Sequence, residues 1–271
     1  EKGMVTVEGL APDRVDKNTR LRAGDRVSVV YPEPEDWSVL PEDIPLDILY
    51  EDSDIIVINK PKGMVVHPAP GVTSGTLVNA LLFHCRDLSG INGVLRPGIV
   101  HRIDKDTTGC IVACKNDFAH EAIAAQLENK TCHREYLAVV AGKLDDDDGL
   151  IDAPIGRDPK DRQRMTVTPK NSREARTHFH VIERFRGATL VQCRLETGRT
   201  HQIRVHMAHI GHPILGDTVY GHKKKELGQD SQCLHAGALC FRHPKDGRPV
   251  MVFAPLPDYF QKVVEKLEKM N

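Results

Sequence analysis

The sequence lacks any long hydrophobic run. No stretch of its 271 residues approaches the roughly 18 consecutive apolar residues that a membrane-spanning helix requires. The opening residues, EKGMVTVEGL, also lack the apolar core of a secretory signal peptide. These two absences predict a cytoplasmic protein with no membrane partner.

Closely spaced cysteine pairs are lacking as well. The chain has seven cysteines, an odd number, and none of them forms a C-x-x-C pair. Cys110, Cys114, Cys193 and Cys240 lie inside apolar or alternating runs, which is typical of reduced core thiols. The sequence therefore predicts free thiols and no disulfide framework.

An overall excess of charge of one sign is also lacking, because 37 Lys and Arg balance 38 Asp and Glu. The distribution is nevertheless uneven. Residues 1–59 contain 14 acidic against 6 basic side chains, whereas residues 156–206 contain 12 basic against 5 acidic ones. A basic face on a neutral chain is compatible with a polyanion bound at one site. On charge alone, a solvated arginine-rich surface explains the pattern equally well.

The chain divides into two parts by its structural signals. Residues 1–31 contain two short alternating patterns, which predict two strands and are too little for a stable domain. Residues 32–43 are rich in proline and acidic residues and are interpreted as a linker. In residues 44–271, many strand patterns and few helix patterns favour an α+β fold on a largely antiparallel or mixed sheet.

Periodicity places the elements of the larger part. Helix patterns cover residues 75–85, 117–130, 201–209 and 257–270. Strand patterns cover residues 55–59, 109–115, 134–142, 176–185, 188–196, 233–241 and 249–255. Asp117 is the predicted N-cap of the second helix, because it directly precedes the apolar helical pattern.

The stretch GIVHRIDKDTTGCIVACKND, residues 98–117, concentrates ionisable groups between two apolar runs. Within six positions it holds His101, Arg102, Asp104, Lys105 and Asp106. A cation beside a carboxyl lowers its pKa and keeps it ionised, ready to act as nucleophile or base. The pattern D-x-D-T also matches aspartate phosphatases, but the β-rich sequel lacks the α/β context of that chemistry. By itself, the stretch favours a charged turn between strands.

A second group of charged residues lies at 195–222. Arg199 stands just ahead of a predicted helix that carries several histidines, namely His201, His206, His209 and His212. None of their spacings is the i, i+4 pair of the zinc motif H-E-x-x-H, so a metal site is not predicted. Histidines and arginines beside a basic segment favour contacts to phosphate.

Tyr136 begins an apolar alternating strand pattern. A tyrosine at a strand end can stack on a planar ring, as aromatic side chains of RNA-binding proteins stack on unpaired bases. A tyrosine packed in the core is the alternative interpretation of the same pattern.

Together these stretches resemble the RluA family of pseudouridine synthases. HRIDKDTTG at 101–109 is similar to the family's H-R-L-D-x-x-T-S-G, with Ile for Leu and Thr for Ser. The other signature blocks of the family resemble, in the same order, residues 50–68, 195–221 and 234–257. Within the family, the chain is most similar to the RluD-like large-subunit ribosomal RNA synthases. Residues 1–31 resemble the end of an S4 RNA-binding module, whose recognition helices are expected before residue 1.

The resemblance implies a pseudouridine synthase fold, with a mixed, mostly antiparallel sheet, flanking helices and a catalytic cleft in residues 44–271. It implies that Asp104 is the catalytic aspartate, that Arg199 pairs with it, and that Tyr136 stacks on the target uracil. Arg102 is implied to hold the displaced nucleotide. The further substrate-binding residues expected from the matching blocks are His101, Thr107, Lys60, His201 and Leu234. Among these, Lys60 is expected to support the floor of the site, and Leu234 to pack against the base.

The activity implied by the resemblance is the isomerisation of specific uridines, in 23S ribosomal RNA, to pseudouridine. Asp104 is expected to act on the ribose, by attack at C1′ or by removal of the 2′ proton. The expected partner is RNA, and no cofactor, no metal and a monomeric state are expected. A transfer RNA substrate and a non-catalytic RNA-binding or ribosome-associated protein stand as alternatives.

Overall fold

The chain forms two units, Glu1–Ser38 and Val39–Asn271, and each is described by itself. The computed structural model describes residues 5–11, 14–16, 18–30, 39–69, 71–93, 96–161 and 164–271. In the smaller unit, β1 (Val5–Val7) and β2 (Val27–Val29) pair antiparallel, as the alternating patterns predict. Residues 32–38 of the expected linker lie outside the described residues. The rest of that segment belongs to the larger unit, where the Asn79 amide donates to the Leu40 carbonyl.

The larger unit combines strands with a few helices. Its strands are β3 (Ile48–Glu51), β4 (Ile55–Lys60), β5 (Thr108–Cys114), β6 (His133–Ala141), β7 (Asp148–Asp152), β8 (Ile155–Arg157), β9 (Met165–Val167), β10 (Ser172–Arg173), β11 (Arg176–Phe185), β12 (Ala188–Leu195), β13 (Leu234–Arg242) and β14 (Pro249–Phe253). Its helices are α1 (Leu77–His84), α2 (Asp117–Glu128), α3 (Gln202–His209) and α4 (Asp258–Glu268). The predicted helices and the longer predicted strands are confirmed.

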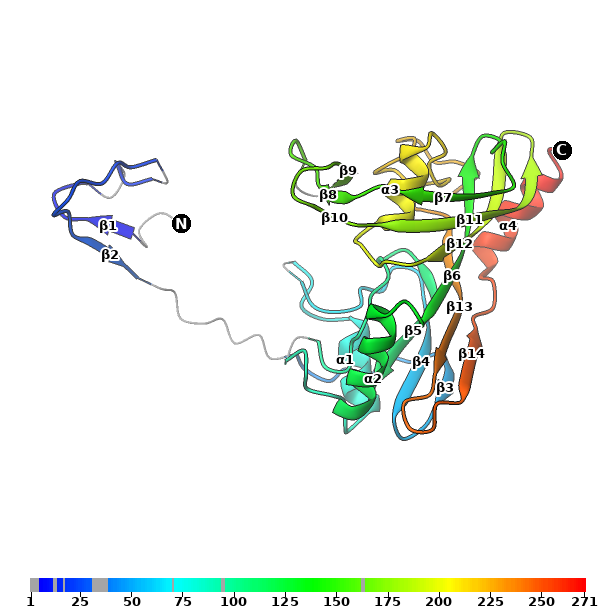
Figure 1. Cartoon of the computed structure of the whole chain (residues 1–271), viewed down its shortest axis with the longest axis horizontal. Helices are drawn as coiled ribbons and strands as arrows, with labels where there is room; N and C mark the ends of the chain where they lie inside the picture. The colour runs from blue at the N-terminus through cyan, green and yellow to red at the C-terminus, as the bar shows by residue number, and fades with distance from the viewer. Residues whose placement is uncertain are drawn as a thin grey trace. The chain divides into compact units, whose positions relative to one another are not determined.

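One large sheet organises this unit (Figure 1). Its strand order is β3-β4-β5-β13-β6-β12-β11-β7, and β14 pairs with β13 outside this path. The pairs are antiparallel except β5 with β13, which run parallel with His235 opposite Thr108. A second, three-stranded sheet has the order β10-β8-β9. The expected α+β fold with a mixed, mostly antiparallel sheet is confirmed.

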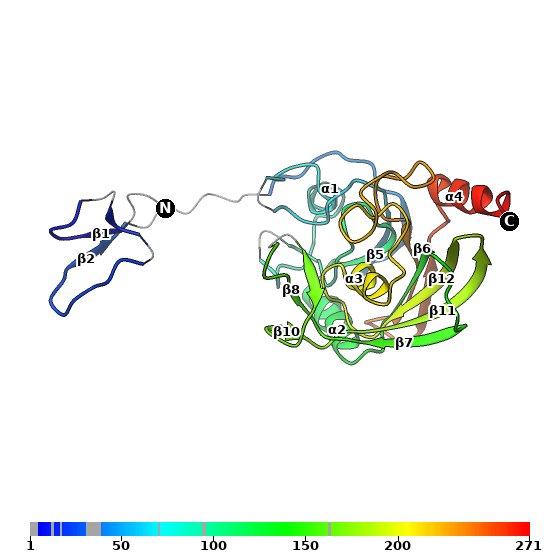
Figure 2. The ribbon, with the colours of Figure 1, turned by 90° about the horizontal axis from the view of Figure 1, so that it is seen from above.

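The central strands are buried on both faces. Side chains of a strand alternate between its faces, so Ile56 and Ile58 of β4 share a core with Leu77 of α1. Ile55 of β4 instead shares a core with Ile123 of α2. Figure 2 shows α1 and α2 on opposite sides of β5. Burial on both faces explains why these strands are continuous apolar runs in the sequence, with each Ile contributing about 1.5–3 kcal/mol.

The helix caps fix where the flanking helices begin. At α1, the Thr76 hydroxyl accepts the Asn79 N–H, and the Asn79 side chain accepts the Thr76 N–H, which is a capping box. At α2, Asn116 is the N-cap, and its side chain accepts the Ala119 N–H. The prediction of Asp117 as the cap was wrong by one position, because Asp117 is already helical and accepts the Ser89 hydroxyl at 2.6 Å.

A glycine allows the parallel pairing of β5 with β13. Gly109 has φ +105°, and a Cβ on it would lie 2.2 Å from the Ala236 carbonyl oxygen. No larger residue fits there without moving β13. This close approach brings the loop before β5 beside the first residues of β13.

The structure adds short elements that the sequence patterns did not indicate, among them β3 and β7 to β10. Each has two to five residues, too few for a clear alternation. The seven cysteines are all free thiols, as expected, and only Cys240 is partly exposed. Among the described helices, none is long and apolar enough to cross a membrane.

Candidate active site

The loop that precedes β5 carries the densest group of ionisable residues. It closes with a turn, in which the Thr107 N–H donates to the Asp104 carbonyl at 3.1 Å. The Lys105 carbonyl accepts two bonds, from Lys60 Nζ at 2.9 Å and from the Gly63 N–H at 3.0 Å. The loop is therefore tied to the end of β4 at the residue that follows Asp104.

Lys60 is completely buried beneath this loop. Its ammonium donates to the carbonyls of Pro61 and Met64 at 2.8 Å each, in addition to Lys105. Burial lowers its pKa to about 7, against the opposing influence of Asp106 and Asp104. With all its donors directed to backbone carbonyls, Lys60 supports the floor of the site.

Asp104 lies at the centre of a buried ion-pair network. Its Oδ2 accepts a hydrogen bond from Arg204 Nη1 at 3.1 Å, and 17% of its side chain is exposed. Arg204 also binds Asp217 through Nε at 2.6 Å and Nη2 at 3.0 Å. The carboxylates of Asp217 and Asp104 raise the pKa of Arg204 despite its burial. Asp104 thus faces a guanidinium that is charged at any physiological pH.

The structure pairs Asp104 with Arg204 rather than with the expected Arg199. The Nε of Arg199 donates to the Glu174 carbonyl at 2.8 Å, and its N–H donates to the Gln202 side chain. The physical reason lies in the helix start. Arg199 precedes α3, whereas Arg204 is its third residue and lies within the first turn. Arg204 comes three positions after His201, and residues three or four positions apart lie on the same face of a helix. Arg199 lines the same pocket as Asp104, at its edge.

His201 is the second nitrogen-bearing group near Asp104, with its Nε2 at 4.0 Å from Oδ1. It has φ +56° at the start of α3, and its Nδ1 bonds the Tyr220 hydroxyl at 2.8 Å. Tyr220 in turn accepts the Met165 N–H at 2.9 Å. Burial is the main cause that lowers the pKa of His201, so the imidazole is neutral at pH 7.

Tyr136 and Leu234 lie in a small inner pocket that also contains Asp104. Both side chains are buried, Tyr136 from β6 and Leu234 from the start of β13. Burial raises the pKa of Tyr136 to about 12, which keeps its phenol protonated at neutral pH. The volume of this pocket is about 50 Å³.

The inner pocket opens into a larger cleft with a volume of about 650 Å³. Asp104, Arg204 and the exposed Arg102 line both cavities. A neighbouring cavity of about 530 Å³ shares Arg102, Arg134 and Arg199 with the inner pocket. Its other basic side chains are Arg96 and Lys130. The lining of this cavity also includes Glu128, Glu174 and Glu196, so its basic side chains outnumber its acidic ones by five to three. A carboxylate beside such arginines is suited to act on one residue of a bound polyanion.

Arg134 also lines the site, although it is not among the residues expected from the sequence. It is 8% exposed, and within the described part of the chain its Nε has no hydrogen-bond partner. Gly198 permits this position, because a Cβ there would lie 2.6 Å from Arg134 Nη1. The sequence did contain a signal for Arg134. Residues two positions apart on a strand point to the same face, so Arg134 shares a face of β6 with Tyr136.

His101 and Thr107 hold the loop from inside. His101 Nε2 accepts the Val112 N–H at 3.1 Å, and burial, aided by Arg134, lowers the pKa of His101 to about 3. The imidazole is therefore neutral. Thr107 is buried and accepts a bond from the Gln232 amide at 3.2 Å. Both residues fix the loop to neighbouring strands and segments.

Comparisons with known proteins give a consistent result. The model of the family described as RNA pseudouridylate synthase matches residues 54–209. A protein of Bacillus subtilis (strain 168), named Uncharacterized RNA pseudouridine synthase YlyB, is 58% identical over 267 residues, or 98% of this chain and 86% of that protein. The Ribosomal large subunit pseudouridine synthase D of Zymomonas mobilis is 46% identical, over 93% of this chain and 82% of that protein.

Solved structures show the same fold. Human RNA Pseudouridylate Synthase Domain Containing 4 has a TM-score of 0.64 at 24% identity, covering 82% of this chain and 92% of that one. Human RNA Pseudouridylate Synthase Domain Containing 1 has a TM-score of 0.62 at 23% identity, covering 88% of this chain and 98% of that one. At these identities, the likeness concerns the arrangement of strands and helices.

Proposed function

The chain belongs to the RNA pseudouridylate synthase family, and on that premise we propose that it modifies uridines of large-subunit (23S) ribosomal RNA through Asp104. Membership makes the protein an RNA pseudouridine synthase, an isomerase. The choice of RNA is supported by relatives named as ribosomal large subunit pseudouridine synthases, which are 46% identical. The observation that carries the role of Asp104 is its place, ion-paired with Arg204 where the inner pocket joins the cleft.

The reaction breaks the N1–C1′ bond of uridine, turns the uracil and rejoins it to C1′ through C5. The C5 proton is lost to water, and N1, which carried no proton in uridine, gains one, so the product is an isomer of the substrate. The uridine must first leave its stack, which costs a few kcal/mol. Contacts from Arg102, Arg134 and Arg199 to the RNA backbone offset this cost. Asp104 then acts on the ribose, either at C1′ or at the 2′ proton.

The inner pocket holds the base while it turns. Tyr136 offers its ring as a stacking surface, and Leu234 supplies the apolar side opposite to the charged groups. Burial raises the pKa of Tyr136 to about 12, so its side chain is a neutral phenol at neutral pH. Tyr136 therefore stacks on the base as a neutral ring and not as a phenolate. Arg204 fixes the direction of the Asp104 carboxylate throughout, through its charge-assisted hydrogen bond.

The pocket must widen before a uracil enters. Its volume of about 50 Å³ is less than a tenth of the about 650 Å³ of the adjoining cleft. The side chains at its mouth are Arg102, which is exposed, and Arg199, which is partly exposed. We infer that these two arginines move outward and bind the flanking phosphates as the base enters.

A non-catalytic RNA-binding role is the alternative from another class. It leaves unexplained why a carboxylate lies among the basic groups, since a carboxylate repels phosphate. A transfer RNA substrate would need no change of the site. In the proposed role the protein acts as a monomer in the cytoplasm, without cofactor or metal, and residues 1–31 serve as part of an S4-like RNA-binding module.

Tritium release tests the proposal. The protein is incubated with 23S ribosomal RNA or transfer RNA that carries 5-tritiated uridine, and the tritium that enters water is counted. We expect release from ribosomal RNA, and complete loss of release in Asp104→Asn with unchanged RNA binding. Asp106→Asn removes a charge from the same loop and is the matched control, expected to retain activity. Turnover by Asp104→Asn would contradict the assignment, and release from transfer RNA alone would change the substrate.

A further inference from the structure

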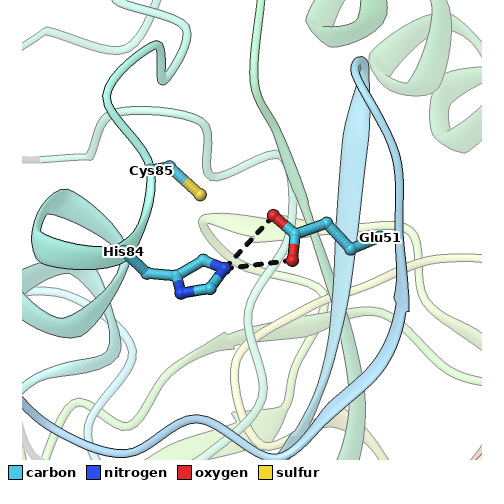
Figure 3. A group of neighbouring side chains, drawn as sticks. All are labelled: Glu51, His84 and Cys85. Carbon is cyan, nitrogen blue, oxygen red and sulfur yellow. Dashed lines mark hydrogen bonds and ion pairs between the residues drawn. The ribbon is translucent and has the colours of Figure 1, made fainter.

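Three side chains with metal-binding atoms meet away from the cleft (Figure 3). Glu51 ends β3, His84 ends α1, and Cys85 follows as the C-cap of that helix. His84 Nε2 lies 3.0 and 3.2 Å from the two carboxylate oxygens of Glu51. The ligand atoms of all three residues lie within 4.8 Å of one another.

We propose that Glu51, His84 and Cys85 form a binding site for a zinc-like divalent cation, each residue supplying one ligand. A carboxylate oxygen, an imidazole nitrogen and a thiolate sulfur are the three donor types that zinc takes in proteins. At metal–ligand distances of about 2.0–2.3 Å, tetrahedral ligands lie about 3.4 Å apart. The observed separations need only small rotations of Glu51 and His84, whose side chains are 28% and 38% exposed.

The local charges favour a cation at this place. His84 is the last residue of α1, where the helix carbonyls carry a partial negative charge. The Cys85 N–H satisfies the Leu81 carbonyl and so holds the thiol at the helix end. Asp87 adds a further negative charge near Cys85.

Lys115 is the competing cation. Its Nζ lies 3.2 Å from Glu51 Oε1 and 2.9 Å from the Asp52 carbonyl, which it can keep as a partner. The other oxygen of Glu51, Oε2, is the one nearest to His84. A cation bound there leaves Lys115 its backbone partner, so the ammonium need not be buried alone.

The burial of Cys85 and its thiol proton determine the order in which the three ligands bind the metal. Cys85 is buried, and its sulfur must give up the thiol proton to bind a metal. A metal binds the thiolate and releases that proton to water. The two exposed ligands, Glu51 and His84, capture the ion first, and the buried thiol completes the set.

A second cluster has similar residue types and is already satisfied. Asp52, Asp54 and His243 also lie close together. However, the Asp52 carboxylate accepts bonds from the Tyr50 hydroxyl, from the N–H groups of Asp54 and Ile55, and from His243. These bonds hold the turn between β3 and β4 and occupy the oxygens that a metal would need. The Glu51 cluster is therefore the one proposed.

The sequence patterns did not indicate the site, because Glu51 and His84 are 33 positions apart. A metal at this place would link the end of an edge strand, β3, to the end of α1. It would stabilise the folded chain by an amount that rises with the logarithm of the metal concentration above Kd, independent of the reaction at Asp104.

Cobalt titration of the untagged full chain tests the site, since a thiolate bound to Co²⁺ gives an intense near-ultraviolet charge-transfer band. We expect one equivalent of Co²⁺ to produce the band and Zn²⁺ to remove it. Cys85→Ser should abolish the band. His84→Asn and Glu51→Gln should weaken affinity by more than the about 10- to 100-fold that the loss of an outer-shell partner costs.

Two control variants and a second measurement make the result unambiguous. Cys240→Ser removes the partly exposed cysteine, and His222→Asn removes an exposed histidine 3.9 Å from Glu226; both should retain the band. Zn²⁺ should also raise the thermal midpoint of the wild type and leave that of Glu51→Gln unchanged. Absence of the band, or its survival in Cys85→Ser, overturns the proposal and leaves an ion-pair network of Glu51, His84 and Lys115. Neither outcome affects the function proposed above, because the titration does not depend on turnover.

Discussion

Arg204 holds Asp104 and Asp217 with a single guanidinium. Two of its nitrogens bind the fully buried Asp217, at 2.6 and 3.0 Å, and the third donates to Asp104 at 3.1 Å. The bidentate pair fixes the plane of the guanidinium, so the bond to Asp104 is aimed before any substrate arrives.

Arg204→Lys should reduce turnover by about 100-fold, because one ammonium cannot hold both carboxylates and Asp104 loses its direction. Arg204→Met should in addition lower the free energy of unfolding by about 3–5 kcal/mol, since the buried Asp217 carboxylate loses its counter-ion. Of the partners that the structure describes, this carboxylate then keeps only the N–H groups of Val219 and Tyr220. Tritium release measures the first effect and urea denaturation the second.

Arg199→Lys is the matched control for this prediction. The Nε of Arg199 bonds only a backbone carbonyl, that of Glu174, so we expect a smaller loss that appears in KM rather than in kcat. Equal losses of kcat in the two lysine variants would contradict the assignment of the pairing role to Arg204.

Tyr136→Phe should retain most of the turnover, whereas Tyr136→Leu should lose nearly all of it. Phenylalanine keeps the ring that stacks on the base, and stacking contributes about 1–3 kcal/mol per base. Measuring kcat in both variants separates the ring from the hydroxyl. Similar large losses in the two would assign the essential role to the hydroxyl instead.

Arg134→Gln should weaken RNA binding and make it less sensitive to salt. Its guanidinium lines the basic cavity, and within the described residues its Nε has no hydrogen-bond partner. Loss of one phosphate contact should reduce the slope of log K against log salt by about 0.7–0.9. Arg186→Gln, at the turn between β11 and β12, is the control and should leave the slope unchanged. An unaltered slope in Arg134→Gln would remove Arg134 from the RNA interface.

Lys60→Met should change how stability depends on pH. The pKa of Lys60 is lowered from 10.5 to about 7 by burial, so between these values the unfolded chain binds a proton that the folded chain does not. The free energy of unfolding of the wild type should therefore rise relative to Lys60→Met between pH 7 and pH 10, by up to about 4 kcal/mol.

Denaturation of both proteins at several pH values measures this difference, in which the other titrating groups cancel. Below pH 7 the difference should be constant, because Lys60 is protonated in both states. A difference that stays flat up to pH 10 would mean that the three carbonyl partners hold the pKa of Lys60 near its ordinary value.

Gly109→Ala should destabilise the protein by about 3 kcal/mol or more, from strain at positive φ and from the clash with the Ala236 carbonyl. Gly187→Ala is the control. Gly187 has φ +81°, but a Cβ there meets nothing within 4 Å, so only about 1–2 kcal/mol is expected. Equal losses in thermal unfolding would show that the approach of β13 to β5 tolerates a side chain.

Much of the fold could be predicted from local patterns. The strands β4 and β5 are continuous apolar runs, and α2 and α4 have clear helical spacing, so their positions were predicted. The cap of α2 was misplaced because Asn116 and Asp117 are both good N-caps, and only the bond from Ser89 to Asp117 distinguishes them. That bond joins segments 28 positions apart and leaves no local signal.

The site was less predictable than the fold. The motif around Asp104 indicated the carboxylate, but which arginine faces it depends on where α3 begins and how Asp217 turns toward it. Arg199 and Arg204 are equivalent in the sequence, but Arg199 precedes α3 and Arg204 lies within it. Arg134 was missed although it shares a strand face with Tyr136, because its place in the site also depends on Gly198, which is 64 positions away and leaves room for its guanidinium.

The position of β13 has a consequence for how the chain folds during synthesis. β5 follows the loop that holds Asp104, and β6, the next strand in the sequence, carries Tyr136. The two strands nevertheless lie on either side of β13. At about 5–20 residues per second, the ribosome delivers β13 roughly 5–20 s after β6. Until then both strands have open edges that can pair with other chains. The pocket therefore cannot exist on the nascent chain before its last strands emerge, and protection of those edges by chaperones is most needed in that interval.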